Sequence, residues 1–247
     1  MISYLITVCD EDLELQKLIN SIVLSEDDEL IILYDSTKVT PEVMDVVLHF
    51  STSLPNVKYF GEPFNGDFAY FKNVGNSKCS KEWIFQVDAD EHLTQDLAEN
   101  VRDIITSNPP ELELVHIPRI NTVQGITLDH VKRWNWNISS DDSIQNCEFF
   151  NTYTDFYFLL KNLDLILHES NSNGEISVIY KEPIINFPDY QGRLYRNKPH
   201  IMWEGKVHER IVGTSVISRL PLQKIYCLVH PKDIIRQERQ NNLYNSL

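Results

Sequence analysis

Along roughly the first 120 residues, the spacing of the apolar positions changes from block to block. Some blocks have the two-residue repeat of a strand, and others have the repeat of about 3.6 residues that is typical of a helix. Short apolar runs rich in β-branched and aromatic residues predict strands, and the amphipathic stretches between them predict helices. The expected elements are, in chain order, strand 2–8, helix 13–24, strand 30–34, a helix from 41, strand 57–60, helix 66–78, strand 83–87, helix 93–106 and strand 112–117. Strands that alternate with helices in this way predict an α/β fold with a mostly parallel sheet.

The pattern becomes harder to assign after residue 120. Residues 121–187 are rich in aromatic side chains and in Asn, Ser and Asp. We interpret residues 120–187 as an insertion or lid, and a small β-subdomain with an ordinary aromatic core is the alternative. Regular patterning returns with strands over 192–196, 200–203 and 225–229 and a final helix over 233–244. We therefore expect one domain over 1–247, made of a first half (1–119), this insertion and a last part (188–247).

Composition limits the class of protein. Of the 247 residues, 42% are hydrophobic and 11% aromatic, which is typical of a globular protein. The 22 Lys and Arg against 36 Asp and Glu give a net charge of −14, which disfavours broad binding to nucleic acid or to an anionic membrane but leaves a local basic groove open. The apolar run at 2–8 is too short to span a bilayer, and the four cysteines form no C-x-x-C pair. These features predict a cytoplasmic protein with free thiols and no stable membrane insertion.

The strand at 83–87 runs directly into three acidic residues, Asp88, Asp90 and Glu91. Open α/β folds bind ligands at the carboxyl ends of their strands, so we expect these carboxylates at a ligand-binding edge. Two Asp separated by the small Ala89 can share a hard cation such as Mg²⁺ or Mn²⁺ with a diphosphate. The motif is short, and a solvated acidic turn is the alternative interpretation.

Two other strands of the first half also end near acidic residues, Asp10 and Asp35. Because the carboxyl ends of parallel strands lie at the same edge of a sheet, we expect both residues beside the acidic turn. Neither G-x-G-x-x-G nor G-x-x-x-x-G-K-[ST] occurs in the chain, so a nucleotide has to be recognised by side chains at these strand ends. Helix N-capping is the alternative role for each residue.

The last part of the chain contains a window of opposite charge. Within 193–210, five Lys and Arg residues stand against two glutamates, which favours contact with an anionic group; a solvated basic face is the alternative. In the same window, His208 is a possible metal ligand and Glu209 a possible general base. His230, after the strand at 225–229, is another candidate metal ligand.

Four stretches of the chain carry motifs that resemble those of one enzyme family. They are Thr7-Val-Cys-Asp-Glu11, Asp35-Ser-Thr37, Gly66 to Asn73 followed by Trp83 to Glu91, and Pro188-Asp-Tyr-Gln-Gly-Arg-Leu-Tyr-Arg196 followed by Trp203-Glu-Gly-Lys-Val-His-Glu209. On these motifs the chain resembles a family 2 glycosyltransferase of the GT-A type, in the branch of lipopolysaccharide core β-glucosyltransferases and prophage peptide S-glycosyltransferases. The resemblance implies a GT-A fold, a Rossmann-like, mostly parallel twisted sheet flanked by helices, here with the aromatic-rich segment inserted.

The resemblance implies donor contacts at both ends of the chain, with 1–119 as the nucleotide-sugar half and 188–247 as the acceptor and catalytic half. The implied donor-binding residues are Asp10, Glu11, Asp35, Asn73, Asp88, Arg193 and Lys206. Asp35 is expected at the base and Asp88 near the ribose, whereas Arg193 or Lys206 is expected to stabilise the charge of the diphosphate. Two departures from the family's motifs leave the nucleotide open: Asp10 replaces the usual Asn, and Lys38-Val-Thr40 replaces a second Ser and Asp.

The resemblance also implies a metal ion and a catalytic base. Asp90 is expected on Mn²⁺ or Mg²⁺, with His230 or His208 as the histidine on the metal or the diphosphate, and Glu209 falls at the family's catalytic acidic residue. These roles predict an inverting, metal-dependent transfer of a sugar from a nucleoside diphosphate sugar, with a UDP-sugar as the expected donor. The acceptor is expected to be a hydroxyl on a glycan, a lipid-linked glycan, a peptide or another biomolecule.

Three alternative functions make different predictions. A phage or viral transferase that glycosylates a modified DNA base predicts a nucleic-acid complex with strong salt dependence. A catalytically silent sugar-nucleotide-binding module predicts donor binding without metal-dependent turnover. A metal hydrolase built on Asp88, Asp90, His208 and His230 has ligands of the right kind but leaves the motif at 188–196 unexplained.

Overall fold

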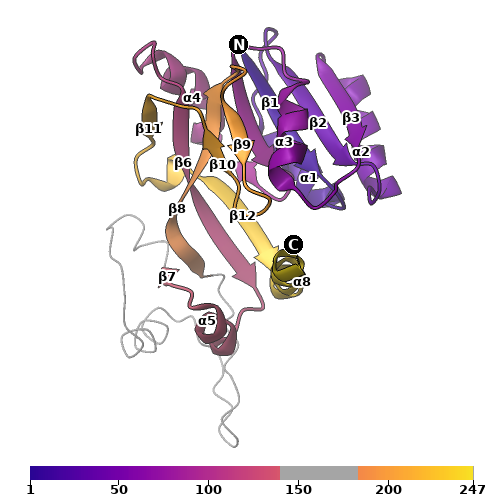
Figure 1. The fold of residues 1–247 in the computed structure, drawn as a ribbon, viewed down its shortest axis with the longest axis vertical. Coiled ribbons are helices and arrows are strands. Elements are labelled where there is room, and N and C mark those ends of the chain that lie inside the picture. The colour runs from indigo at the N-terminus through magenta and orange to yellow at the C-terminus, as the bar shows by residue number, and fades with distance from the viewer. Residues whose placement is uncertain (140–182, 247) are drawn as a thin grey trace, which may run out of the picture. The chain divides into compact units, whose positions relative to one another are not determined.

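The structure is a computed structural model that describes residues 1–139 and 183–246. The chain divides into two compact units. Unit 1 contains Met1–Ile117 and Tyr190–Leu220, and unit 2 contains Pro118–Asp189 and Pro221–Ser246. Two long strands, β6 (Leu114–Gln124) and β8 (Ile184–Arg196), are drawn in Figure 1. Each contributes residues to both units.

Unit 1 alternates strands and helices through its first part and ends in short strands. Its elements are β1 (Ile2–Val8), α1 (Asp12–Ser21), β2 (Glu29–Asp35), α2 (Pro41–Ser53), β3 (Val57–Glu62), α3 (Phe68–Asn76), β4 (Trp83–Asp88), β5 (His92–Leu93), α4 (Gln95–Thr106), β9 (Met202–Glu204), β10 (Arg210–Val212) and β11 (Ile217–Arg219). Side-chain caps fix two helix starts: Thr40 accepts from the Val43 N–H before α2, and Asp67 accepts from the Tyr70 N–H before α3.

The sheet of unit 1 has the strand order β3-β2-β1-β4-β8-β6. The first four strands are parallel, β8 is antiparallel to β4, and β11 adds to β6 in parallel. Strands β9 and β10 form a separate antiparallel hairpin. Because the chain runs outward from β1 through β2 to β3 and then returns to the other side of β1 at β4, the carboxyl ends of β1 and β4 flank a topological switch point, where open α/β sheets bind ligands.

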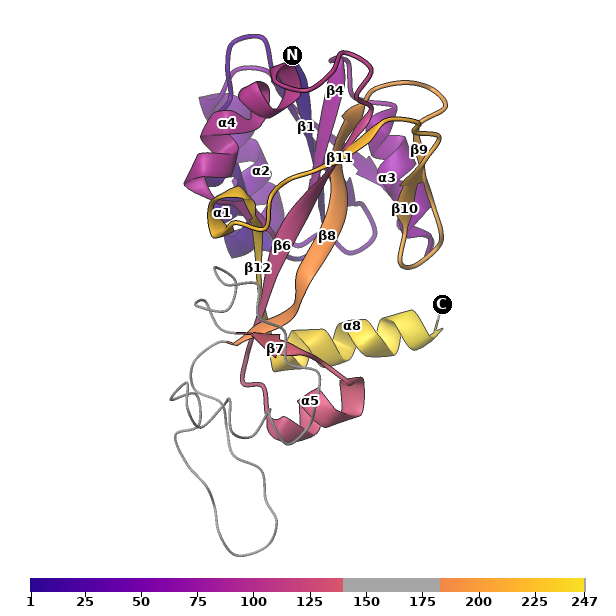
Figure 2. The same ribbon diagram turned by 90° about the vertical axis from the view of Figure 1, so that its left-hand side faces the viewer.

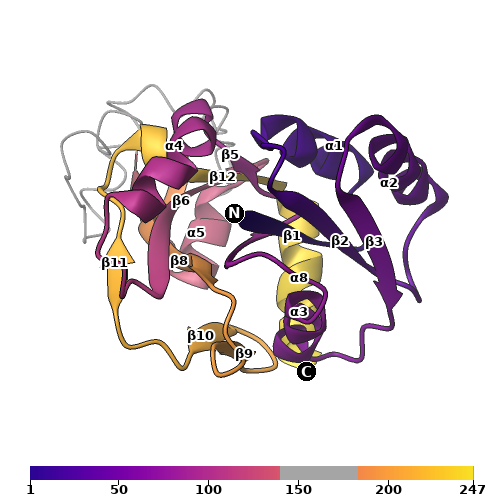
Figure 3. The ribbon, with the colours of Figure 1, turned by 90° about the horizontal axis from the view of Figure 1, so that it is seen from above.

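Helices cover both faces of this sheet. Figure 3 shows α1 and α2 on one face and α3 on the other. The core beneath α3 includes Leu5, Ile31, Ala69, Phe71 and Trp203. Helix α3 approaches β1 closely because Gly75 has no side chain: a Cβ there would lie 2.8 Å from Leu5 Cδ1.

Unit 2 is built on the part of β6 from Pro118 to Gln124. Strand β12 (Leu228–Asp233) pairs in parallel with β6 from Arg119 to Gln124, and β7 (Ile138–Ser139) pairs with the start of β8. Helices α5 (Leu128–Trp134) and α8 (Ile234–Ser246) lie close to each other (Figure 2), and a 3₁₀ helix spans Lys224–Tyr226. The unit's core contains Val123, Ile126, Val131, Ile138 and Ile185.

The predicted α/β fold with a mostly parallel, helix-flanked sheet is confirmed, and the bounds of several strands differ. The strand expected to end at 117 continues to Gln124, because β6 pairs with β12 from Arg119 onwards. The strand thus passes through Pro118, a residue without the N–H that a strand normally donates. The strand expected at 192–196 already begins at Ile184. The strand expected at 225–229 begins only at Leu228, where pairing with β6 starts.

The predicted insertion at 120–187 falls largely on residues 140–182, which lie outside the described residues. The predicted division into 1–119, 120–187 and 188–247 stays a prediction. None of the helices in the part of the chain that the structure describes has the length and hydropathy needed to cross a bilayer.

Candidate active site

The carboxyl ends of β1, β2 and β4 form one edge of the unit 1 sheet. These strands are parallel neighbours, and Thr7 lies opposite Asp88 in the register. The Thr7 hydroxyl donates to Asp88 Oδ1 at 2.9 Å. The expectation that these strand ends meet at a single edge is confirmed, and the acidic residues that follow them lie in neighbouring turns.

Glu11 closes the turn that follows β1. Its Oε2 accepts hydrogen bonds from the backbone N–H groups of Cys9 (2.7 Å) and Asp10 (3.1 Å). Asp10 is exposed, whereas Glu11 is half-buried. The turn therefore presents Asp10 to solvent while Glu11 stabilises the backbone, and contact of either residue with a nucleoside stays a prediction.

Asp35 is buried at the end of β2, where it organises two loops. Its Oδ1 accepts from the Thr37 N–H (2.9 Å), the Thr37 hydroxyl (2.7 Å) and the Phe64 N–H (3.1 Å). These bonds tie the end of β2 to the segment after β3. None of these three hydrogen bonds ends on Oδ2, and contact of Asp35 with a nucleobase stays a prediction.

Asp88 is the centre of a charged cluster at the end of β4. Arg193 Nη2 donates to Asp88 Oδ2 at 2.7 Å and to Glu91 Oε1 at 2.6 Å. Lys72 Nζ lies 3.1 Å from Asp88 Oδ1, and Gln86 Nε2 donates to the same oxygen at 2.8 Å. Two cations and two neutral donors therefore hold this carboxylate in place.

The charges of the cluster shift its acid–base equilibria. Burial on its own raises the pKa of Asp88, but Arg193 and Lys72 outweigh burial and hold this pKa well below its usual value. Burial on its own lowers the pKa of Arg193, but the Asp88 and Glu91 carboxylates outweigh burial and raise it. Asp88 is therefore ionised and Arg193 protonated at neutral pH.

Arg193 and Glu91 are buried beneath the acidic turn. Their side chains are 3% and 0% exposed. Glu91 Oε2 also accepts from the Asp88 N–H at 3.1 Å, which fixes the backbone at the start of the turn. The guanidinium of Arg193 thus engages the protein's own carboxylates, and its contact with a diphosphate stays a prediction.

The other basic residues of 193–210 are divided between paired and exposed positions. Arg196 pairs with Glu82, and Lys198 Nζ lies 2.7 Å from Glu113 Oε1. Lys206 is exposed. Carboxylates therefore offset part of the positive charge of this window, and Lys206 is the predicted donor-binding cation whose side chain reaches solvent.

Glu209 lies on the hairpin of β9 and β10, which packs against α3. Asn73 fixes this hairpin through the backbone of Trp203: its Nδ2 donates to the carbonyl and its Oδ1 accepts from the N–H, each at 2.9 Å. The Glu209 carboxylate pairs with Lys72 Nζ at 2.7 Å. Lys72 therefore contacts both Glu209 and Asp88, although these residues come from distant parts of the chain, and a nucleotide contact of Asn73 stays a prediction.

The candidate metal ligands lie in different surroundings. In unit 1, Asp90 is partly exposed in the turn after β4, and His208 is exposed in the hairpin loop. In unit 2, His230 is buried in β12. Within residues 1–139 and 183–246, no group of three or more His, Cys, Asp or Glu is arranged to hold a metal ion. The carboxylate of Asp90 is the hard oxygen donor that Mg²⁺ and Mn²⁺ prefer, so its chemistry fits such an ion.

A polar chain within unit 2 orients His230. Arg119 Nη2 and Asn121 Nδ2 donate to Asp189 Oδ2 at 2.7 and 2.8 Å. With its NH₂ group turned to Asp189, Asn121 presents Oδ1 to His230 Nδ1 at 2.7 Å. The network therefore assigns a proton to Nδ1; in the neutral ring this leaves the lone pair on Nε2, the tautomer that suits a metal ligand.

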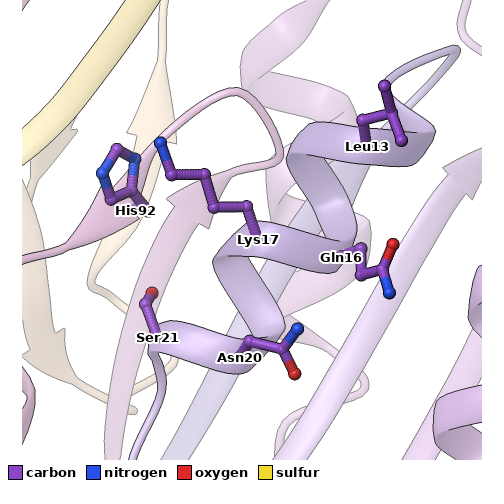
Figure 4. A pocket seen from close by; sticks show the side chains of 6 residues that line it. All are labelled: Leu13, Gln16, Lys17, Asn20, Ser21 and His92. Atoms are coloured by element: carbon purple, nitrogen blue, oxygen red, sulfur yellow. The ribbon is translucent and has the colours of Figure 1, made fainter.

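A shallow depression of about 450 Å³ lies elsewhere on unit 1, between α1 and β5 (Figure 4). It is lined by Leu13, Gln16, Lys17, Asn20, Ser21 and His92. Figure 4 shows Lys17 extending from α1 towards His92, and burial together with this cation lowers the pKa of His92 to about 4. The depression shares no residue with the predicted site.

Comparison with known families shows the family to which the chain belongs. The sequence profile of the family described as glycosyl transferase family 2 matches residues 3–162, which is more than half of the chain. The chain belongs to this family. The predicted glycosyltransferase class is confirmed at the family level, whereas the proposed branch stays a prediction. No curated protein sequence matches the chain.

Several solved structures resemble part of this family 2 member. S. aureus TarS 1-349 in complex with UDP-GlcNAc is 16% identical, with a TM-score of 0.39; the match covers 51% of this chain and 35% of that chain. The mannosyltransferase PcManGT from Pyrobaculum calidifontis, in complex with GDP-Man and Mn²⁺, is 14% identical, with a TM-score of 0.42 and coverage of 48% and 35%. Glucosyl-3-phosphoglycerate synthase from Mycobacterium tuberculosis, in complex with Mn²⁺, UDP and phosphoglyceric acid, is 15% identical, with a TM-score of 0.38 and coverage of 49% and 43%.

Sequence reasoning gave no role to Lys72, Asn121 or Asp189, which the structure places at the centre of two networks. Lys72 carried a detectable signal, because it lies three residues after Ala69 and three before Gly75 on the buried face of a helix. A lysine at such a position requires a buried partner. The pairing of Asn121 and Asp189 carried no comparable signal, because their separation of 68 residues is closed only by the fold.

Proposed function

We propose that this family 2 member is an inverting, metal-dependent glycosyltransferase that moves a sugar from a nucleoside diphosphate sugar to an acceptor hydroxyl. The observation that carries the proposal is the Lys72 ammonium, which contacts the carboxylate at the end of β4 and the candidate base on the hairpin. This arrangement holds a donor-binding carboxylate and a proton acceptor in one unit. UDP-sugars are the donors to test first.

The strand ends of unit 1 are assigned to the donor. Asp35 Oδ2 accepts from the base, Asp10 contacts the nucleoside, and Asp88 accepts from the ribose. Asp90 would hold Mn²⁺ or Mg²⁺, with His208 as its candidate histidine ligand in the same unit, and His230 of unit 2 stays a predicted ligand. When bound, the ion offsets the negative charge that develops on the leaving diphosphate.

Glu209 is assigned as the general base. It takes the proton of the acceptor hydroxyl while the acceptor oxygen forms a bond to the anomeric carbon. The bond from that carbon to the diphosphate oxygen breaks, and its electron pair leaves with the nucleoside diphosphate. Attack from the face opposite the leaving group inverts the anomeric configuration. Lys206, which is exposed, is assigned to contribute positive charge near the diphosphate.

A donor screen tests the proposal. The purified protein is incubated with UDP-, GDP-, TDP- and CMP-sugars in Mn²⁺ or in EDTA, and release of free nucleotide is followed. We expect slow hydrolysis of one donor, abolished by EDTA and by Asp90→Asn. Glu209→Gln should lower turnover by about 10²–10⁴-fold, the usual contribution of a general base, while donor affinity stays within about threefold.

Asp45→Asn, the same change at an exposed position of α2, is the matched control and should behave as the wild type. If no donor is turned over but one binds, the chain is a sugar-nucleotide-binding module and the proposal is wrong. If hydrolysis persists in EDTA, the metal-dependent part of the proposal is wrong. The stereochemistry of the product, read by NMR once an acceptor is found, decides between inversion and retention.

A further inference from the structure

Lys72 occupies an unusual position for a lysine. Its side chain is 4% exposed, on the buried face of α3, and its Nζ lies 2.7 Å from Glu209 Oε1 and 3.1 Å from Asp88 Oδ1. Lysine is almost never buried in this way unless it is paired. Glu209 lies 137 residues further along the chain, so the ion pair joins two segments that only the fold brings together.

The hairpin that carries Glu209 depends on α3 for its position. Strands β9 and β10 have three residues each, and a two-stranded hairpin of this size has little stability by itself. Besides the two Asn73 bonds, the Phe68 N–H donates to the Lys206 carbonyl at 3.0 Å, and the Lys72 ammonium lies 4.6 Å from the centre of a Trp203 ring. Lys72 thus contacts both Trp203, in the middle of β9, and the Glu209 carboxylate in the hairpin loop.

The Asp88 carboxylate has other support. The Thr7 hydroxyl, Gln86 Nε2 and Arg193 Nη2 donate to it at 2.9, 2.8 and 2.7 Å. Loss of the Lys72 ammonium therefore leaves Asp88 with three donors and a full positive charge beside it. For Glu209, the same loss removes an ion pair that fixes the direction of its carboxylate.

We propose that Lys72 is a positioning residue, which fixes the Glu209 carboxylate at a set place relative to Asp88 and so aligns the base with the donor. This inference rests on the proposed function. A compact ammonium with three donors can bridge two carboxylates that approach from different sides. A general base works only when it lies within hydrogen-bonding reach of the proton it removes.

Steady-state hydrolysis of the donor, with water as the acceptor, separates this role from a merely structural one. Lys72→Met should lower kcat by about 10–100-fold, the loss that a misplaced reactive group causes, while the KM for the donor changes less than about threefold. Lys72→Arg keeps the charge and should recover part of the lost kcat. Lys78→Met, the same change at an exposed residue just after α3, is the matched control and should leave both constants unchanged.

The decisive test is a double-variant cycle with Glu209→Gln. If Lys72 acts through Glu209, then Lys72→Met should lower kcat by less than about threefold in the Glu209→Gln background, because groups that act as a unit are not additive. Losses that multiply in the double variant would overturn the proposal, as would a Lys72→Met variant whose KM rises while kcat is kept.

A second readout does not require activity. Lys206 and Arg210 are exposed trypsin sites on the hairpin. If Lys72 holds the hairpin in place, then Lys72→Met should be cleaved at these sites at least about fivefold faster than the wild type and the Lys78→Met control, with the far-UV circular dichroism unchanged. Equal cleavage rates would overturn the positioning role. Absence of turnover in the wild type would instead overturn the proposed function, so the two failures are distinguishable.

Discussion

Replacement of Arg193 by Met is the sharpest test of the charged cluster at the end of β4. The side chain of Arg193 is 3% exposed and bonds Asp88, Glu91 and Gln86, and Glu91 is fully buried. Met fills a similar volume but carries no charge. The variant therefore leaves the Glu91 carboxylate buried without its cation.

The expected loss of stability follows from that burial. Removing one partner of a buried ion pair typically costs about 3–5 kcal/mol, because the remaining charge stays in a poorly solvating environment. For a chain of this size, each kcal/mol shifts the midpoint of thermal unfolding by roughly 2–4 °C, so we expect a decrease of about 6–20 °C. Differential scanning calorimetry at neutral pH measures this shift.

Two further variants make the result interpretable. Arg133→Met removes a cation of similar chemistry from an exposed pair with Asp129 on α5, and should cost at most about 1 kcal/mol. Arg193→Met combined with Glu91→Met removes both buried charges and should recover part of the lost stability. An Arg193→Met midpoint within about 2 °C of the wild type would refute the reasoning that this network is buried and paired.

Three other predictions concern the scaffold of unit 1. Burial on its own raises the pKa of Glu29, but hydrogen bonds from two serines and Lys58 outweigh burial and lower this pKa from 4.5 to about 2. A depressed carboxyl pKa stabilises the fold above pH 4.5, and this stabilisation is lost as the pH falls through 2. In urea unfolding, the wild type should therefore be about 3 kcal/mol more stable than Glu29→Gln at pH 6, and this advantage should disappear as the pH falls to 2. Asn73→Ala leaves the Trp203 carbonyl and N–H without these two partners, which should lower the free energy of unfolding by about 1–3 kcal/mol and speed hydrogen exchange at the Trp203 amide. Unchanged exchange would contradict the described docking of the hairpin. Gly75→Ala forces a methyl group against Leu5 and should cost about 1–3 kcal/mol in the same urea assay, and a stability equal to the wild type would show that α3 and β1 can separate without penalty.

The local elements of unit 1 were predictable because their signals are short in range. The first strand was predicted at 2–8 and is observed at Ile2–Val8, and the helix expected from 41 begins at Pro41. A short apolar run and a proline in the first turn of a helix are signals that act over a few residues, so the sequence alone contains them. The acidic strand ends were predictable for the same reason, since a parallel α/β order places them at one edge whatever the rest of the chain does.

The direction of individual charged side chains was decided by the tertiary structure. The basic window indicated an anionic partner for Arg193 without saying which one. β8 places Arg193 next to β4, where Asp88 and Glu91 bond it, and its contact with a diphosphate stays a prediction. A count of charges along the chain contains no information on which face of a strand a side chain occupies or which carboxylate lies there.

The sequence by itself determined the family, the parallel sheet and the set of candidate acids. Only the tertiary structure decided how the acids are held: Lys72 bridges Asp88 and Glu209 across separations of 16 and 137 residues. The physical reason is that an ion pair depends on distance in space and on desolvation, and both are set when the hairpin packs against α3. Local propensity is a property of the chain, whereas the pairing of charges is a property of the fold.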